Sequence, residues 1–177
     1  MTTRPVLILP GYDNSGPEHW QSLWEKAHPS FRRVQQRSWT EPVCDDWVAA
    51  LDQALIAAPA PPVLVAHSLG GLAVAHHAAR HPRPVHGALL VAPPNVDDPA
   101  FPPLIRGFRP IPRARLPFPS IVVSGSDDWY MAVDDARGLA RAWGSRFVVI
   151  ERGGHLNADA GFGPWPEGER LLAELTA

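Results

Sequence analysis

The chain has 177 residues, of which 45% are hydrophobic and 19% charged, and its formal net charge is −2. This length suits one globular domain over residues 1–177, and the composition is too apolar for a disordered chain. The near-neutral charge provides no global field that would attract nucleic acid or an anionic membrane, so neither partner is expected.

Short runs of apolar, often β-branched residues recur along the chain and predict strands. In chain order these are Val6–Leu9, a weaker run at 33–39, Val63–His67, 87–92, 120–124 and Arg146–Ile150. Most of them are continuously apolar rather than alternating, which is typical of parallel strands buried on both faces.

Apolar residues at helical spacing predict helices between these strands. The first predicted helix begins at Pro17. The other predicted helices cover 43–58, 68–81, 133–143 and the region around 171–175. Residues 93–119 are proline-rich with little periodicity, which indicates an irregular surface segment and not a helical lid. The alternation predicts an α/β fold of three layers, with about six mostly parallel strands in the order 2-1-3-4-5-6 and helices on both faces.

The most informative stretch is the point where the predicted strand Val63–His67 runs into Ser68 and then into a helix. With Ala66 before it and Gly70 after it, Ser68 fits a G-x-S-x-G nucleophile elbow in which alanine replaces the first glycine. The alternative is that Ser68 only caps the helix. A serine hydroxyl is a weak nucleophile without a neighbouring imidazole, so the elbow requires a base and an acid elsewhere in the chain.

Chain order selects that base and that acid. In the α/β-hydrolase arrangement the acid and then the histidine follow the serine, each after a later strand. His155 is the only histidine after the carboxylates that follow the fifth predicted strand. Of the two adjacent aspartates there, we select Asp128 as the partner of His155 and expect Asp127 to brace the turn. The predicted catalytic residues are therefore Ser68, Asp128 and His155.

The first predicted strand is followed by Gly11 and Tyr12. From this position the backbone N–H of Tyr12, together with that of Leu69, is expected to form an oxyanion hole, while Gly11 permits close approach. The residues expected to line the substrate pocket are Gly11, His67, Trp129 and Trp165.

No metal or organic cofactor is expected. His77 and His81 are one helical turn apart, but no third ligand is evident, and neither a P-loop nor a G-x-G-x-x-G motif occurs. The single cysteine, Cys44, excludes a disulfide framework. The apolar run Val6–Leu9 is too short for a signal peptide, and no stretch approaches the roughly 18 apolar residues of a membrane span. We therefore expect a cytoplasmic protein, and its alanine-rich, lysine-poor composition indicates a bacterial source.

These motifs together resemble the small serine hydrolases of the retinoblastoma-binding protein nine type, over nearly the whole chain. The matching motifs are Pro10-Gly11-Tyr12-Asp13 with His19-Trp20, His67-Ser68-Leu69-Gly70, Gly125-Ser126-Asp127-Asp128, Gly154-His155, and the stretch from Gly161 to Pro166. The resemblance implies a compact α/β-hydrolase fold without a lid and activity on small esters. It also assigns the nucleophile, acid and base to Ser68, Asp128 and His155. No L-x-C-x-E motif occurs, so binding to pocket proteins is not expected.

The sequence thus predicts a carboxylic-ester hydrolase that acts on small, short-acyl substrates through an acyl-enzyme intermediate. A thioesterase or an amidase with the same three residues is one alternative, because such a triad serves all acyl transfers. A protein-interaction module that retains the triad without physiological turnover is the other.

Overall fold

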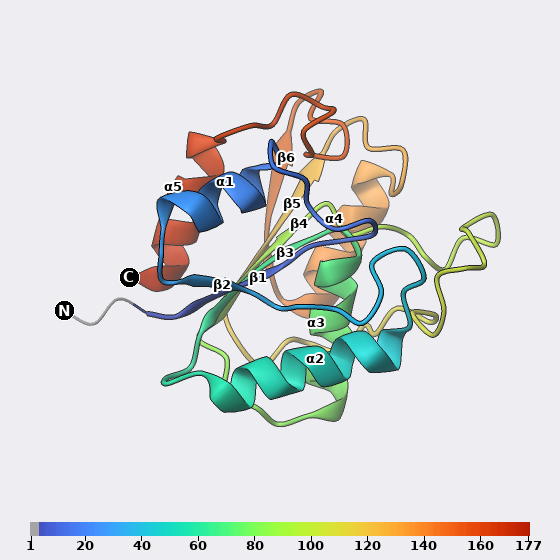
Figure 1. Ribbon diagram of the computed structural model, residues 1–177. Coiled ribbons are helices and arrows are strands. Elements are labelled where there is room, and N and C mark those ends of the chain that lie inside the picture. Colours follow the sequence, from blue (N-terminus) through green and yellow to red (C-terminus); the bar gives the residue numbers. More distant parts are fainter. Residues whose placement is uncertain (1–3) are drawn as a thin grey trace.

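The computed structural model describes residues 4–177, which form a six-stranded sheet in the order β2-β1-β3-β4-β5-β6 (Figure 1). The strands are β1 (Val6–Leu9), β2 (Phe31–Arg33), β3 (Val63–His67), β4 (Gly87–Val91), β5 (Ser120–Gly125) and β6 (Arg146–Ile150). Every neighbouring pair is parallel. The predicted fold class and strand order are confirmed.

Five helices cover the two faces of this sheet. They are α1 (Trp20–Ala27), α2 (Cys44–Ala57), α3 (Leu69–Arg80), α4 (Val133–Trp143) and α5 (Pro166–Thr176). Helices α1 and α5 lie on one face, and α2, α3 and α4 lie on the other (Figure 1). None of the helices formed by residues 4–177 is both long enough and apolar enough to span a membrane.

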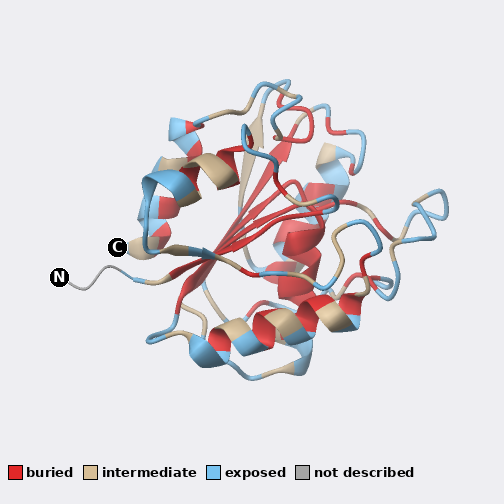
Figure 2. Cartoon of the chain, in the orientation of Figure 1, coloured by how far each residue is buried: buried red, intermediate tan, exposed pale blue. Residues whose placement is uncertain are grey.

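The central strands are apolar along their whole length because both of their faces are covered. Successive side chains of a strand point to opposite faces. In β3, Val63 and Val65 belong to the core layer under α1 and α5, whereas Leu64 and Ala66 belong to the layer under the other helices. Figure 2 shows the central strands buried throughout. The continuous apolar runs of the sequence therefore have a direct cause in the three-layer arrangement.

The second strand differs from its prediction. β2 has only three residues and precedes most of the predicted strand 33–39. Instead of pairing in the sheet, Trp39 accepts a hydrogen bond from the backbone N–H of Asp13 through its carbonyl oxygen, and its ring packs against Trp47 of α2 with centroids 5.7 Å apart. Beyond β2, the N–H of Val34 still donates to the carbonyl oxygen of Ile8 in β1 at 2.9 Å, whereas Trp39 serves helix packing and not a strand.

Helix α1 also starts later than predicted, at Trp20 instead of Pro17. His19 is the N-cap, and its Nδ1 accepts a hydrogen bond from the backbone N–H of Gln21 at 3.2 Å. A side-chain acceptor at this position satisfies one of the free N–H groups of the first turn. Histidine is an uncommon cap, so the sequence carries little sign of this helix start.

The segment between β4 and β5 has no helix or strand, as predicted from its prolines. It is attached to the domain by buried side chains, the largest of which is Phe108, and by a single bridge between Val43 and Arg106. The N–H of Asn95 also donates to the carbonyl oxygen of Tyr130 at 2.8 Å. This last contact joins the segment to the loop that follows β5.

Candidate active site

Ser68 lies between the last residue of β3 and the first residue of α3. Its backbone has φ 53° and ψ −125°, a conformation that L residues rarely adopt, and its N–H donates to the carbonyl oxygen of Val91 at 2.9 Å. The Ser68 side chain makes no capping hydrogen bond to α3. The strained turn thus directs the hydroxyl away from the helix, against the alternative that Ser68 is an ordinary cap.

The glycine two residues after Ser68 is required by close backbone packing. A Cβ atom on Gly70 would lie 2.2 Å from the carbonyl oxygen of Leu9 and 2.8 Å from that of Pro10. Ala66, two residues before the serine, instead places its methyl group in the core layer under α2 and α3. The two small positions of the elbow therefore have different structural roles.

The three residues predicted to be catalytic are brought together. His155 Nε2 lies 2.9 Å from Ser68 Oγ, and His155 Nδ1 lies 2.9 Å from Asp128 Oδ2. All three residues are buried. Because a carboxylate only accepts, Nδ1 of His155 donates to Asp128 and Nε2 is free to accept the hydroxyl proton of Ser68. This is the tautomer that a general base requires.

The turn after β5 holds the His155 loop from one side. The N–H of Gly154 donates to Asp127 Oδ1 at 2.8 Å, and the N–H of Arg152 donates to Ser126 Oγ at 2.9 Å. Gly125 allows the two loops to touch, since a Cβ atom there would lie 2.1 Å from the carbonyl oxygen of Gly154. Asp127 therefore braces the loop, which is the role expected for the aspartate not selected as the acid.

The start of α1 and the end of β3 hold the same loop from the other side. Trp20 Nε1 donates to the carbonyl oxygen of Leu156, and His67 Nε2 donates to that of His155, each at 2.8 Å. The rings of His67 and His155 lie 4.9 Å apart. His67 was expected to line the substrate pocket, but its hydrogen bond shows a supporting role under the His155 loop. Sequence reasoning missed Trp20, whose only signal was its place in the His19-Trp20 motif.

Two buried histidines next to His155 are kept neutral. Burial holds the pKa of His67 well below its usual value, and the nearby rings of His155 and His19 act in the same direction. Burial, with smaller contributions from Arg33 and His155, lowers the pKa of His19 to about 4. Nδ1 of His19 accepts a hydrogen bond, so the proton of the neutral ring lies on Nε2. Protonation of either ring would place a buried positive charge beside the site.

We expect the free energy of unfolding to decrease as the pH falls below about 6.5. The unfolded chain then binds protons at His19 that the native protein, with a pKa of about 4 at this residue, does not bind. Between pH 7.5 and pH 5 this group alone should cost about 2 kcal/mol. Urea unfolding at both pH values measures the loss. His19→Asn, which keeps a capping oxygen but cannot titrate, should lose correspondingly less, and equal losses in the two proteins would contradict the assignment.

The backbone amides expected to form the oxyanion hole have no competing partner. In the part of the chain that the structure describes, the N–H groups of Tyr12 and Leu69 donate to no backbone carbonyl. Gly11 lies directly beside the serine, since a Cβ atom there would be 2.7 Å from Ser68 Cβ and 3.3 Å from Ser68 Oγ. The absence of a side chain at Gly11 thus lets the strand end that carries Tyr12 approach the Ser68 hydroxyl closely.

Gly11→Ala is expected to lower kcat/KM by at least about 10², the usual effect of losing one oxyanion donor. The added methyl group must displace the Ser68 side chain or the strand end that carries Tyr12. Hydrolysis of a 4-nitrophenyl ester measures the effect. Gly16→Ala is the matched control, because a Cβ atom at Gly16 meets no atom within 4 Å. A Gly11→Ala enzyme as active as this control would show that the close approach of Gly11 to Ser68 is not needed for activity.

The two tryptophans expected in the substrate pocket lie in different environments. Trp129 is 75% exposed on the surface beside the site. Trp165 is only 6% exposed, and its ring packs against Trp20 and Trp24 with centroids 5.1 and 6.0 Å away. Placing Trp165 in the pocket was therefore wrong, because this side chain fills the core layer between α1 and α5.

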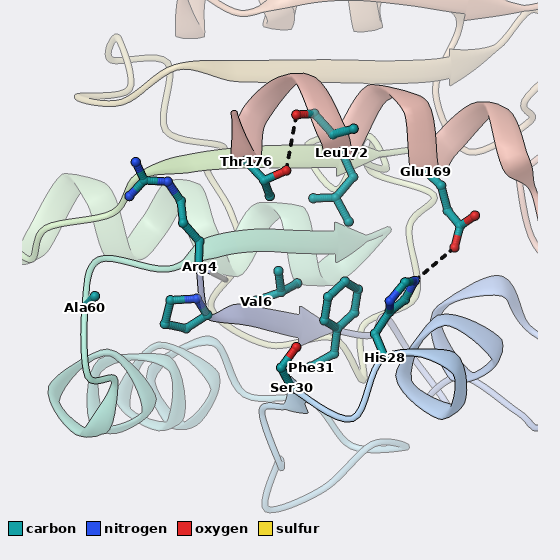
Figure 3. A pocket seen from close by; sticks show the side chains of 11 residues that line it. Arg4, Val6, His28, Ser30, Phe31, Ala60, Glu169, Leu172 and Thr176 are labelled. Atoms are coloured by element: carbon teal, nitrogen blue, oxygen red, sulfur yellow. Dashed lines mark hydrogen bonds and ion pairs between the residues drawn. The ribbon is translucent and has the colours of Figure 1, made fainter. Parts of the chain in front are cut away.

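Two cavities in the part of the chain that the structure describes lie away from Ser68. One of about 710 Å³ lies at the amino end of β1, between β2 and α5, where His28 and Glu169 form a hydrogen bond (Figure 3). A second of about 510 Å³ lies between the segment around Asn95 and α4. Neither is lined by a residue of the predicted triad.

The pair of histidines formed by His77 on α3 and His81 directly after it has a structural partner. His77 Nε2 lies 3.0 Å from Asp52 Oδ1 of α2, and His81 Nδ1 lies 3.9 Å from the same oxygen. Within residues 4–177, no group of three or more His, Cys, Asp or Glu side chains could hold a metal ion. The pair therefore serves the packing of α2 against α3.

Solved structures similar to this chain are α/β hydrolases. A YdeN-like hydrolase from Pectobacterium atrosepticum is 33% identical, with a TM-score of 0.87 over 98% of this chain and 91% of its own. The ydeN gene product of B. subtilis is 20% identical, with a TM-score of 0.81 over 98% of each chain. A thermophilic esterase from Thermogutta terrifontis is 18% identical, with a TM-score of 0.66 over 99% of this chain and 92% of its own. The last two likenesses show the fold alone.

No curated protein sequence matches the chain. The serine hydrolase family matches residues 6–174, a range that runs from β1 into α5 and includes Ser68, Asp128 and His155. The chain therefore belongs to the serine hydrolase family.

Proposed function

We propose that the protein is a carboxylic-ester hydrolase in which Ser68 is the nucleophile, His155 the general base and Asp128 the acid that orients it. The observation that carries the proposal is the continuous buried chain of hydrogen bonds from Ser68 Oγ through both ring nitrogens of His155 to Asp128 Oδ2, with both distances 2.9 Å. Such a chain activates a hydroxyl that is otherwise a poor nucleophile.

In the acylation half of the reaction, Ser68 Oγ attacks the ester carbon while its proton passes to His155 Nε2. A bond forms between Oγ and the carbonyl carbon, and the electron pair of the C=O bond moves onto oxygen, where the N–H groups of Tyr12 and Leu69 stabilise it. When the tetrahedral intermediate collapses, the bond to the alcohol oxygen breaks. That oxygen takes the proton from His155, and the alcohol leaves.

In the deacylation half, a water molecule replaces the alcohol. His155 Nε2 removes a proton from water as its oxygen attacks the acyl carbon, and then returns the proton to Ser68 Oγ as the acid leaves. Asp128 stays ionised throughout and stabilises the imidazolium form of His155. The cycle balances without a metal or an organic cofactor.

The narrower family placement is also a proposal. Motifs similar to those of the retinoblastoma-binding protein nine type support it, and three of them meet in one place. His67-Ser68 ends β3, Gly154-His155 forms the loop above it, and Trp20 holds that loop through the carbonyl oxygen of Leu156. Small esters with short acyl groups are the proposed substrates, because the segment between β4 and β5 has no helix that could form a lid over the site.

A labelling experiment combined with a substrate panel tests this function. A fluorophosphonate probe should label the native protein, and peptide mass spectrometry should locate the adduct on Ser68. Matched acetyl esters, thioesters and amides, followed by esters of increasing acyl length, should show the highest kcat/KM for short-chain esters. A preference for thioesters or amides would favour the corresponding hydrolase. Labelling without turnover on any class would favour an interaction module, and a peak at long acyl chains would contradict the short-acyl assignment.

A further inference from the structure

Aromatic side chains form a row that begins at the catalytic histidine, and two of them are exposed. The ring of Tyr130 lies 4.5 Å from that of His155, centroid to centroid, and is tilted against it. From the ring of Tyr130, the exposed ring of Trp129 lies 5.9 Å away and the half-buried ring of Phe101 lies 6.4 Å away. Tyr130 is 42% exposed and Trp129 is 75% exposed. Large aromatic side chains gain most when buried, so two of them in solvent beside a reactive group point to a ligand.

The first ring of this row is held in place by backbone hydrogen bonds. The N–H of Tyr130 donates to Asp128 Oδ1 at 2.9 Å, so the same carboxylate that orients His155 also positions Tyr130. At the other end of the residue, the carbonyl oxygen accepts from the N–H of Asn95 at 2.8 Å. Phe101 comes from the same irregular segment as Asn95. The surface is thus built from two loops that are tied to each other and to the triad, as a preorganised binding site requires.

We infer that Tyr130, Trp129 and Phe101 form the subsite for the leaving group and that the enzyme selects esters of apolar, above all aromatic, alcohols. This inference rests on the proposed ester hydrolysis. When the C–O bond breaks, its electron pair stays on the alcohol oxygen and His155 Nε2 gives that oxygen a proton. The alcohol must therefore lie against the His155 ring at that moment, and Tyr130 packs against the same ring.

The acyl group has a different place. Its carbonyl oxygen faces the N–H groups of Tyr12 and Leu69 in the proposed mechanism, where Gly11 approaches Ser68 closely. The rings next to His155 are thus available to the alcohol. Flat aromatic groups suit them best, since tilted and offset contacts between rings add attraction beyond the burial of area. Trp129, expected from the sequence to line the substrate pocket, is thereby assigned to the alcohol part of the substrate.

The test holds the acyl group constant and varies the alcohol. The full chain is assayed on ethyl, butyl, benzyl and 2-naphthylmethyl acetate, which all pass through the same acetyl-enzyme, so differences in kcat/KM report the alcohol alone. The native enzyme should prefer the two aromatic alcohols. Trp129→Ala should lower the ratio of kcat/KM for benzyl acetate to that for ethyl acetate about 5-fold, mainly through KM, and Trp129→Phe should restore most of it.

A second series and a control variant separate the possible outcomes. Ile56→Ala, at an exposed apolar position on α2, should leave the benzyl-to-ethyl ratio unchanged. The ratio of ethyl hexanoate to ethyl acetate should be the same in Trp129→Ala as in the native enzyme. If Trp129→Ala changes this acyl ratio and not the alcohol ratio, the subsite assignment is wrong although ester hydrolysis stands. If the native protein hydrolyses no ester and the fluorophosphonate does not label Ser68, both the subsite and the proposed function fail.

Discussion

Ser68→Ala is expected to lower kcat for ester hydrolysis by about 10⁶, the effect of removing the nucleophile where nucleophile and base act as a unit. No other hydroxyl is hydrogen-bonded to His155 Nε2 within residues 4–177. Fluorophosphonate labelling should disappear with the activity. Initial rates on 4-nitrophenyl acetate and gel fluorescence of the labelled protein measure the two effects.

The fold should survive this substitution, which makes the result interpretable. Alanine has the same Cβ atom as serine, so the strain of the backbone at φ 53° is present in both proteins. The hydroxyl makes no capping bond to α3 that alanine would remove. Circular dichroism and the Tm should therefore stay close to those of the native protein. An adduct that persists on another residue would falsify the assignment of Ser68 as the nucleophile.

Asp128→Asn is expected to lower kcat by about 10⁴ with little change in geometry. An asparagine amide placed toward His155 Nδ1 donates a hydrogen bond, so the ring nitrogen must accept and its proton moves to Nε2. His155 can then no longer accept the proton of Ser68. In the native protein Asp128 also accepts the N–H of Tyr130 through its second oxygen, an interaction that the asparagine carbonyl can retain. Rates measured over a range of pH should stay low throughout.

Asp127→Asn is the matched control for that result. Asp127 uses Oδ1 to accept the N–H of Gly154 at 2.8 Å, and an asparagine carbonyl oxygen can accept the same bond. The loss of activity should therefore be far smaller than in Asp128→Asn. A larger loss in Asp127→Asn would mean that the two adjacent aspartates have the opposite roles.

The sheet could be predicted from the sequence because its strands are buried on both faces. Runs such as Val63–His67 are apolar at every position, and helical spacing resumes directly after them. β2 was misplaced because an edge strand of three residues carries almost no pattern of its own. The apolar residues that suggested a longer strand include Trp39, which packs on α2. Tertiary contacts thus overrode the local signal at the one weak strand.

The site could be predicted where its signal is local or follows from chain order. Ser68 lies at a strand-to-helix junction, and His155 is the only histidine after the fifth strand's carboxylates. The contacts that support the site join residues that are distant in sequence. Trp20 is hydrogen-bonded to Leu156, 136 residues later, and Gly125 packs against the backbone of Gly154. No spacing rule reveals such pairs. The same limit explains Trp165, which is near His155 in the sequence but turns into the core.

Ala66 and Gly70, two positions before and after Ser68, are packed differently. This difference has a consequence for sequence searches and for mutagenesis of such enzymes. A search pattern that demands glycine two positions before the nucleophile would miss this chain, whereas glycine two positions after it can be demanded safely. Position 66 can enter a mutational library limited to small residues, since its side chain is fully buried in the packed core layer. Position 70 should be left out, because any Cβ atom there collides with the backbone of β1 next to the amide of Tyr12.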